Sequence, residues 1–222
     1  MSSAAGFPPA QAVPRWHPGE PLDPLRELLR RGGIIAVPTE SSYGLAVDPC
    51  NPRAVRAVYE LKGRPASAAL PVAVAHRDQL ESLGIAPDAP GLNHLLALWP
   101  AALTAVLPLA PGQTLAAADG AAGTVAVRIP DHPLLRRLLE ELGPLTVTSA
   151  NRSGEAPVTD PDAAAALLAG WDGAVVDDGA LAGGPPSTLV QWRGHGWAVL
   201  RSGRFDPAPL LEKSEDQEGR EL

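Results

Sequence analysis

The stretch 124-TVAVRIPDHPLLRRLLEELGPLTVT-148 indicates the fold class of this 222-residue chain. It starts with Thr124–Ile129, a run rich in β-branched residues that is typical of a buried strand. After Pro133, leucines recur at helical spacing over Leu134–Leu142, and a Gly-Pro pair ends that helix. Leu145–Thr148 is apolar again and predicts a second strand. The stretch therefore predicts strand, helix and strand, as in a crossover unit.

The same alternation continues on both sides of this stretch. Asx-Pro pairs at residues 23–24, 51–52 and 160–161 each predict a capped helix start, and a further helix is expected near Ala89–Trp99. Arg193–Gly196 predicts a hairpin turn, so the sheet is expected to be mixed. The chain thus predicts an α/β domain with a twisted mixed β-sheet flanked by helices. The other expected strands are Ile34–Val37, Leu70–Ala75, Leu103–Leu107, Ala174–Val176, Ser187–Gln191 and Trp197–Leu200.

Composition limits the class of protein. Hydrophobic residues make up 45% and charged residues 19% of the chain, as in globular domains. The formal net charge of −7 argues against a protein that coats nucleic acid by bulk charge, although it permits a local basic cleft. The single cysteine excludes an internal disulfide and a cysteine-rich zinc site.

Three parts are expected along the chain. Residues 1–21 are rich in proline and predict a flexible N-terminal segment, residues 22–206 a catalytic domain, and residues 207–222 a flexible charged tail. The N-terminus lacks a basic start followed by an apolar run, and the apolar runs are too short to span a membrane. A cytoplasmic location without membrane contact is therefore expected.

Polar residues gather where the predicted strands end, which is where α/β sheets bind ligands. Lys62 and Arg64 are expected on an exposed loop after the second helix, where the helix dipole alone explains them. A local turn alone explains Ser149 and Asn151. Arg128 is harder to explain, because an unpaired charge in an apolar strand is very costly. It must therefore reach a partner, such as an Asp or Glu of the chain, or solvent.

Taken together, the cations Lys62, Arg64, Arg128 and Arg201 can neutralise a polyphosphate. The chain contains no GxxxxGK[ST] loop and no GxGxxG after a strand, and its five histidines show no zinc-ligand spacing. A P-loop is therefore excluded, and the pattern of a dinucleotide-binding fold is also absent.

The ordered motifs resemble those of the YrdC-like family of threonylcarbamoyl-AMP synthases. They are 38-PTESSYGL-45, 62-KGRP-65, 125-VAVRIP-130 with 132-HP-133, and 149-SANRSG-154. The resemblance runs from about Leu22 to Gly203. The chain is similar to the short bacterial form of this family. It implies a central, positively charged hollow beside the sheet. It also implies synthesis of threonylcarbamoyl-AMP and pyrophosphate from L-threonine, bicarbonate and ATP, for threonylcarbamoyladenosine modification of tRNA.

The resemblance also implies roles for single residues. The L-threonine site would contain Thr39, Arg128, Ser149 and Ser187. The ATP site would contain Lys62, Arg64, Thr124, Asn151, Thr159 and Arg201. Mg²⁺ would accompany ATP without dedicated protein ligands. A contact with tRNA or double-stranded RNA, and hand-over of the product to the tRNA threonylcarbamoyl-transferase complex, are also implied. No general base is identified.

The chain departs from the family pattern at three places: Ala68-Ala69 replaces the usual Asn-Pro, Trp99-Pro-Ala-Ala102 the usual Trp-Pro-Gly-Pro, and Ser41-Ser42 the common Thr-Val. A non-catalytic nucleotide- or RNA-binding module acting in RNA maturation or translation is therefore the alternative function. Carbamoyl chemistry of the hydrogenase-maturation kind is a second enzyme alternative. Zinc-finger and acylphosphatase-like segments, which accompany it in larger chains, are absent from these 222 residues.

Overall fold

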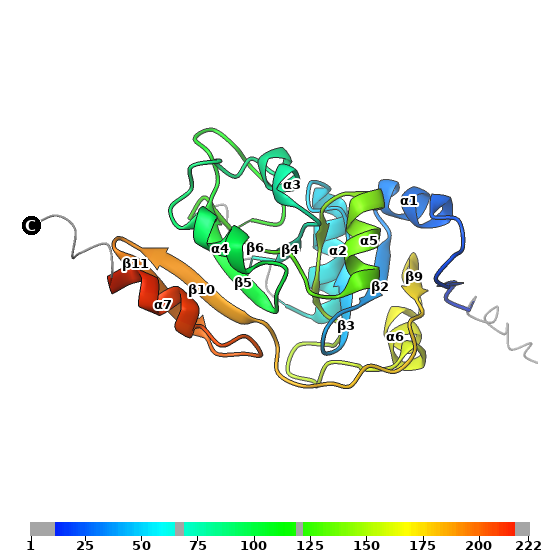
Figure 1. Ribbon diagram of the computed structural model, residues 1–222. Helices are drawn as coiled ribbons and strands as arrows, with labels where there is room; N and C mark the ends of the chain where they lie inside the picture. The colour runs from blue at the N-terminus through cyan, green and yellow to red at the C-terminus, as the bar shows by residue number, and fades with distance from the viewer. Residues whose placement is uncertain (1–11, 65–68, 119–121, 216–222) are drawn as a thin grey trace, which may run out of the picture.

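The computed structural model describes residues 12–64, 69–118 and 122–215, and it places two β-sheets side by side with helices around them (Figure 1). The helices are α1 (Asp23–Arg30), α2 (Pro52–Lys62), α3 (Arg77–Ser82), α4 (Leu92–Leu98), α5 (Pro133–Leu142), α6 (Pro161–Leu168) and α7 (Ala208–Glu215).

The first sheet has five strands in the order β1 (Arg15–Trp16), β9 (Gly173–Val176), β2 (Ile34–Pro38), β3 (Tyr43–Ala46) and β8 (Thr148–Ser149). The second has six strands in the order β11 (Gly196–Arg201), β10 (Thr188–Arg193), β5 (Leu103–Pro108), β6 (Thr124–Arg128), β4 (Val72–Ala73) and β7 (Leu145–Thr146).

Both sheets are mixed, which confirms the predicted mixed α/β class. In the five-stranded sheet β2 runs parallel to β9 and antiparallel to β3. In the six-stranded sheet β10 runs parallel to β5, and the predicted β10–β11 hairpin closes at Arg193 and Gly196. The strands divide between two sheets, whereas the sequence pattern predicted one.

The division is clearest at residues 145–149, where a single strand was predicted. The segment forms two short strands instead, β7 in the six-stranded sheet and β8 in the five-stranded sheet, with Val147 between them. The Thr146 hydroxyl accepts a hydrogen bond from the Val47 amide at 3.0 Å and ties the two sheets together there. Because β6 is parallel and β7 antiparallel to β4, the predicted crossover unit is also wrong.

Two of the three expected helix caps are confirmed. The Asn51 side chain accepts hydrogen bonds from the amides of Arg53 and Ala54, and Asp160 accepts one from Ala163. Asp23 instead lies inside the first turn of α1, where its carboxylate pairs with Arg26 at 2.9 Å. The buried leucines of α1 pack with those of α5 in a second hydrophobic cluster beside the main core.

The described residues at the two ends of the chain, 12–21 and 207–215, include regular structure. Within the N-terminal segment, β1 pairs with β9 as an edge strand, and Trp16 is buried with its indole N–H donating to the Pro21 carbonyl at 3.0 Å. Within the tail, α7 packs along β11, and Leu210 is buried. A buried apolar side chain therefore anchors each end to the rest of the fold. Residues 1–11 and 216–222, like Ala68, lie outside the described residues.

Candidate active site

The six-stranded sheet presents a polar face beside the junction of the two sheets. Val125 and Val127 of β6 belong to the main core, so the alternate residues Thr124, Ala126 and Arg128 point to the opposite face. Cross-strand register places further residues on this face. We call this surface the polar face; it comprises Thr104, Val106, Pro108, Thr124, Ala126, Arg128, Leu189, Gln191 and Arg201.

Lys62 forms a cluster with the loop after β8. Its ammonium group donates hydrogen bonds to the Ser149 carbonyl at 2.6 Å, the Asn151 carbonyl at 3.1 Å and the Asn151 side-chain oxygen at 2.9 Å. The Ser149 hydroxyl donates to the same Asn151 oxygen at 2.6 Å, and the Lys62 carbonyl accepts from the Ser153 amide. The last turn of α2 and the 149–153 loop are therefore held together by one lysine.

The position of Lys62 corrects an expectation. It is the last residue of α2 and only 4% exposed, whereas an exposed loop was predicted for it. Burial and the positive charge of Arg64 lower the pKa of Lys62 to about 8. All three of its protons meet neutral oxygen acceptors, so the cluster keeps a positive charge when the lysine is protonated. Gly63 follows with a φ of 61°, a left-handed conformation that ends the helix before Arg64.

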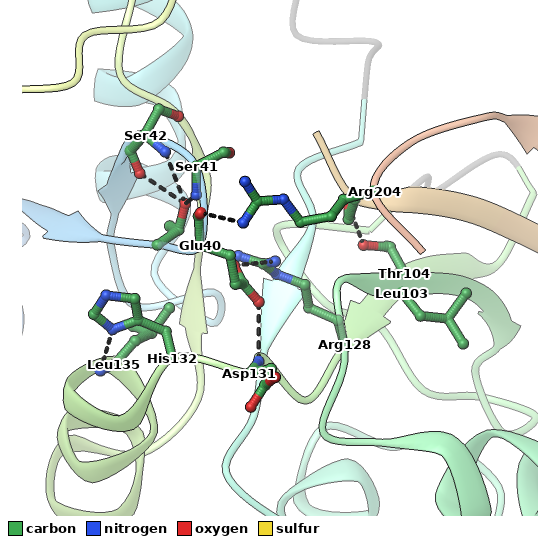
Figure 2. Close-up of polar contacts among 12 residues, drawn as sticks. Glu40, Ser41, Ser42, Leu103, Thr104, Arg128, Asp131, His132, Leu135 and Arg204 are labelled. Carbon is green, nitrogen blue, oxygen red and sulfur yellow. Dashed lines mark hydrogen bonds and ion pairs between the residues drawn. The ribbon is translucent and has the colours of Figure 1, made fainter. Parts of the chain in front are cut away.

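Arg128 forms a second cluster, at the end of β6. Its Nη1 donates to the Glu40 carboxylate at 2.9 Å, and both side chains are only 9% exposed (Figure 2). The family resemblance implies the threonine carboxylate as the partner of Arg128, and the alternative is an Asp or Glu of the chain. In this ligand-free structure the partner is an acidic residue of the chain.

Arg201 and Ser187 lie close to Arg128. Arg201 donates to the Ser187 carbonyl at 2.9 Å, and the Ser187 hydroxyl lies 2.8 Å from the hydroxyl of Thr104 on the polar face. Partial desolvation and the positive charge of Arg128 lower the pKa of Arg201. The backbone approach is close here, because a side chain on Gly203 would collide with the main chain at Pro186 and Ser187.

The turn between β2 and β3 connects the two clusters. Thr39 is buried, and its hydroxyl donates to the Ser42 carbonyl at 2.7 Å, so it stabilises this turn. Gly44 pairs with Ser149 across β3 and β8, and a side chain there would lie 2.7 Å from Val147 and 3.4 Å from Thr39. Thr39 therefore lies between Ser149 of the Lys62 cluster and Glu40 of the Arg128 cluster.

The structure brings together eight of the ten predicted site residues: Thr39, Lys62, Arg64, Arg128, Ser149, Asn151, Ser187 and Arg201. Thr124 lies at the opposite end of β6 from Arg128, about 13 Å away at the usual rise per strand residue. Thr159 lies just before α6, and its carbonyl accepts from the Leu181 amide at 2.7 Å. Among the described residues, no side-chain hydrogen bond joins either threonine to the other eight.

Three residues that the sequence analysis did not single out help to build the site. The first is Glu40. The second is Arg204, which donates to the Glu40 carbonyl at 2.6 Å (Figure 2). Arg204 also donates to the Gly183 carbonyl at 3.1 Å. His132 caps α5 by accepting from the Leu135 amide, and its other ring nitrogen faces the Asp178 carboxylate at 3.6 Å. Burial lowers the pKa of His132. Glu40 and His132 lie within the quoted motifs, but no local spacing indicates their distant partners.

Comparison with known proteins identifies the class to which this fold and site belong. The family model Sua5/YciO/YrdC, described as telomere recombination, matches residues 27–203. The chain belongs to this family, which confirms the resemblance drawn from the motifs.

Individual relatives carry a more particular name. The chain is 38% identical to a threonylcarbamoyl-AMP synthase of Bacillus subtilis over 178 residues. The matched segment covers 79% of this chain and 51% of that protein. It is 40% identical to a threonylcarbamoyl-AMP synthase of Vibrio cholerae over 139 residues, and this matched segment covers 61% of this chain and 73% of that protein. A solved structure of P. abyssi Sua5 complexed with L-threonine superposes with a TM-score of 0.77 at 30% identity, covering 91% and 60%. The chain thus spans about half the length of the Bacillus relative.

Proposed function

We propose that this chain is an L-threonylcarbamoyladenylate synthase, a nucleotidyltransferase that forms threonylcarbamoyl-AMP and pyrophosphate from L-threonine, bicarbonate and ATP. The observation that carries the proposal is the meeting of the motif residues at one junction, with Lys62 held by Ser149 and Asn151 and Arg128 beside Arg201. The named relatives and the threonine complex of P. abyssi Sua5 support it.

The ATP phosphates fit the Lys62 cluster. Lys62 and Arg64 are two cations at the end of one helix, and the oxygens around Lys62 are neutral, so its charge is available to a polyanion. The nucleoside would extend along the polar face toward Thr124, with Arg201, Asn151 and Thr159 as further contacts. The 13 Å length of this face suits an extended nucleotide.

L-Threonine fits the Arg128 cluster. The guanidinium would bind the substrate carboxylate with nitrogens other than the one occupied by Glu40. Thr39, Ser149 and Ser187 would supply hydroxyl groups near the amino acid. Thr39 and Ser149 adjoin Gly44, so the amino acid would sit between the phosphates and Arg128.

The chemistry then depends on position and charge. Bicarbonate releases CO₂ and hydroxide, and the threonine ammonium gives one proton to that hydroxide, which leaves as water. The neutral amine attacks CO₂ and loses a second proton to solvent to form a carbamate. A carbamate oxygen then attacks the α-phosphorus of ATP, and the bond from that phosphorus to pyrophosphate breaks. Carbamates decompose in water, so a partly buried junction that holds the carbamate beside the nucleotide favours the second step. Lys62 and Arg64 would stabilise the charge that develops on the phosphates.

We further propose that Mg²⁺ enters with ATP. Mg²⁺ keeps several of its waters and is commonly held through substrate phosphates. Within the described residues, no group of three or more His, Cys, Asp or Glu side chains could hold a metal ion. The ATP phosphates and water would therefore supply the ligands of the ion, which would neutralise the leaving pyrophosphate.

The product would serve threonylcarbamoyladenosine modification of tRNA next to the anticodon. We propose a cytoplasmic location, contact with tRNA or double-stranded RNA, and hand-over to the tRNA threonylcarbamoyl-transferase complex, because the adenylate is too reactive to be a free product. In the described part of the chain, no helix is long and apolar enough to cross a membrane.

Product analysis by mass tests the proposal. The purified chain with ATP, bicarbonate, L-threonine and Mg²⁺ should yield threonylcarbamoyl-AMP and pyrophosphate, and omitting threonine should abolish both. A folded protein that binds ATP without forming a threonine-dependent adenylate would support the non-catalytic binding module instead.

A further inference from the structure

Glu40 is fully engaged at the junction between the two sheets. One carboxylate oxygen accepts from Arg128 at 2.9 Å, and the other accepts from the Asp131 amide at 2.9 Å. Its main-chain carbonyl accepts from Arg204 at 2.6 Å (Figure 2). The residue therefore links the β2–β3 turn to the end of β6 and to the segment after β11.

These contacts fix the direction of Glu40. A buried ion pair overcomes its desolvation cost only when good geometry and extra hydrogen bonds satisfy the charges. Both oxygens of Glu40 have a donor, and one of those donors is a main-chain amide that cannot rotate away. Glu40 is thus held independently of Arg128.

Within the described part of the chain, Arg128 is held through one nitrogen. Within the described residues, Nη1 is the guanidinium nitrogen that has a hydrogen-bond partner. The side chain is 9% exposed, so the guanidinium has little space in which to turn. With Nη1 fixed by Glu40, the orientation of the remaining nitrogens is also fixed.

We propose that Glu40 is a positioning residue for amino-acid recognition, which acts by orienting Arg128 so that its unpaired nitrogens face the substrate carboxylate. This inference rests on the proposed function, because it takes L-threonine as the ligand of Arg128. The pair with Glu40 also cancels the charge of Arg128. Recognition of the carboxylate then depends on the direction of the guanidinium.

A binding measurement on the full chain tests this inference without requiring turnover. L-Threonine and ATP are titrated separately by calorimetry into the wild type and into Glu40→Gln, which keeps the size of the side chain and an acceptor for the Asp131 amide. The expected result is threonine binding about tenfold weaker, the scale of one hydrogen bond to a charged group, with ATP binding within about twofold. Glu140→Gln is the matched control, because Glu140 is exposed on α5, and it should change neither titration.

A double-mutant cycle shows whether Glu40 acts through Arg128. In the Arg128→Lys background, Glu40→Gln should weaken threonine binding by less than about twofold, because the fork that Glu40 orients is gone. Full additivity would overturn the inference, and so would unchanged threonine binding in Glu40→Gln. Tighter threonine binding would overturn it as well, since Glu40 would then compete with the substrate for Arg128.

The outcomes separate this inference from the proposed function. If the wild type binds threonine but forms no adenylate, the proposed function fails, and a weakened Glu40→Gln still supports the positioning role. If adenylate forms and Glu40→Gln binds threonine normally, the function stands and the positioning role fails. A wild type that binds no threonine, with or without ATP, overturns both.

Discussion

Lys62 and Arg128 are both buried cations, but their surroundings differ in one respect. Lys62, 4% exposed, is surrounded by neutral oxygens of Ser149 and Asn151. Arg128 is 7% exposed as a whole residue, and it meets the carboxylate of Glu40. The Lys62 cluster therefore keeps a net positive charge, whereas the Arg128–Glu40 pair is neutral.

This difference separates two kinds of recognition within one site. An uncompensated cation attracts a polyanion from any direction, and burial makes that attraction strong. A paired arginine offers directed hydrogen bonds, which suit a single planar carboxylate. The division predicts that changes at Lys62 affect ATP and that changes at Arg128 affect threonine.

The largest effect is expected for Lys62→Ala, which removes the uncompensated charge. The rate of adenylate formation should fall by about 100-fold or more, the usual scale for losing one preorganised electrostatic group. Because three acceptors lose their donor, the melting temperature should also fall. Steady-state kinetics over a range of ATP concentrations and a thermal melt measure the two effects. Arg64 is half-buried, so Arg64→Ala should lower activity with little change in melting temperature. If Lys62→Ala uses ATP normally, the distinction between the two clusters is wrong.

Arg128→Lys should have the next largest effect. Lysine keeps the charge but loses the planar fork. The threonine concentration for half-maximal rate should rise about 10- to 100-fold, while the value for ATP changes little. Titrating each substrate at saturating levels of the other measures this. An unchanged threonine dependence would mean that the ion pair with Glu40 is purely structural.

The pH dependence should show a smaller effect that is specific to Lys62. Its pKa is lowered from 10.5 to about 8, so between these values the unfolded chain binds more protons than the folded chain. The free energy of unfolding should therefore rise with pH in that window. ATP affinity should fall over the same window, by up to about tenfold near pH 9, as the ammonium loses its charge. Lys62→Arg should remove this decline, and an identical decline in that variant would assign it to another group.

The smallest effect is expected from truncation after Leu211, which leaves both clusters intact. The buried anchor of α7 is Leu210, and the residues beyond Leu211 are almost wholly polar or charged. Activity should stay within about twofold and melting within a few degrees, as for most surface changes. Leu210→Ala provides the contrast, since a buried leucine usually contributes about 2–5 kcal/mol to stability. A large loss of activity on truncation would show that the C-terminal residues contact the site.

The sequence by itself determined the local features of this protein. Periodic apolar residues predicted the main strands and helices, and the Asx-Pro pairs predicted the starts of α2 and α6. The ordered motifs indicated the family and most of the residues that meet at the junction. An arginine in an apolar strand indicated that Arg128 needs a partner. All of these inferences depend on interactions within a few residues, which a linear pattern records.

Only the tertiary structure decided how distant segments meet. Glu40 lies 88 residues from Arg128, and no spacing rule connects them. Strand pairing divided residues 145–149 between two sheets, and packing of α2 against the 149–153 loop buried a lysine that was expected in solvent. Periodicity shows which side chains will be buried, but the packing of the whole chain determines which partner each buried charge finds. The charge balance that distinguishes the two clusters is therefore a property of the folded chain.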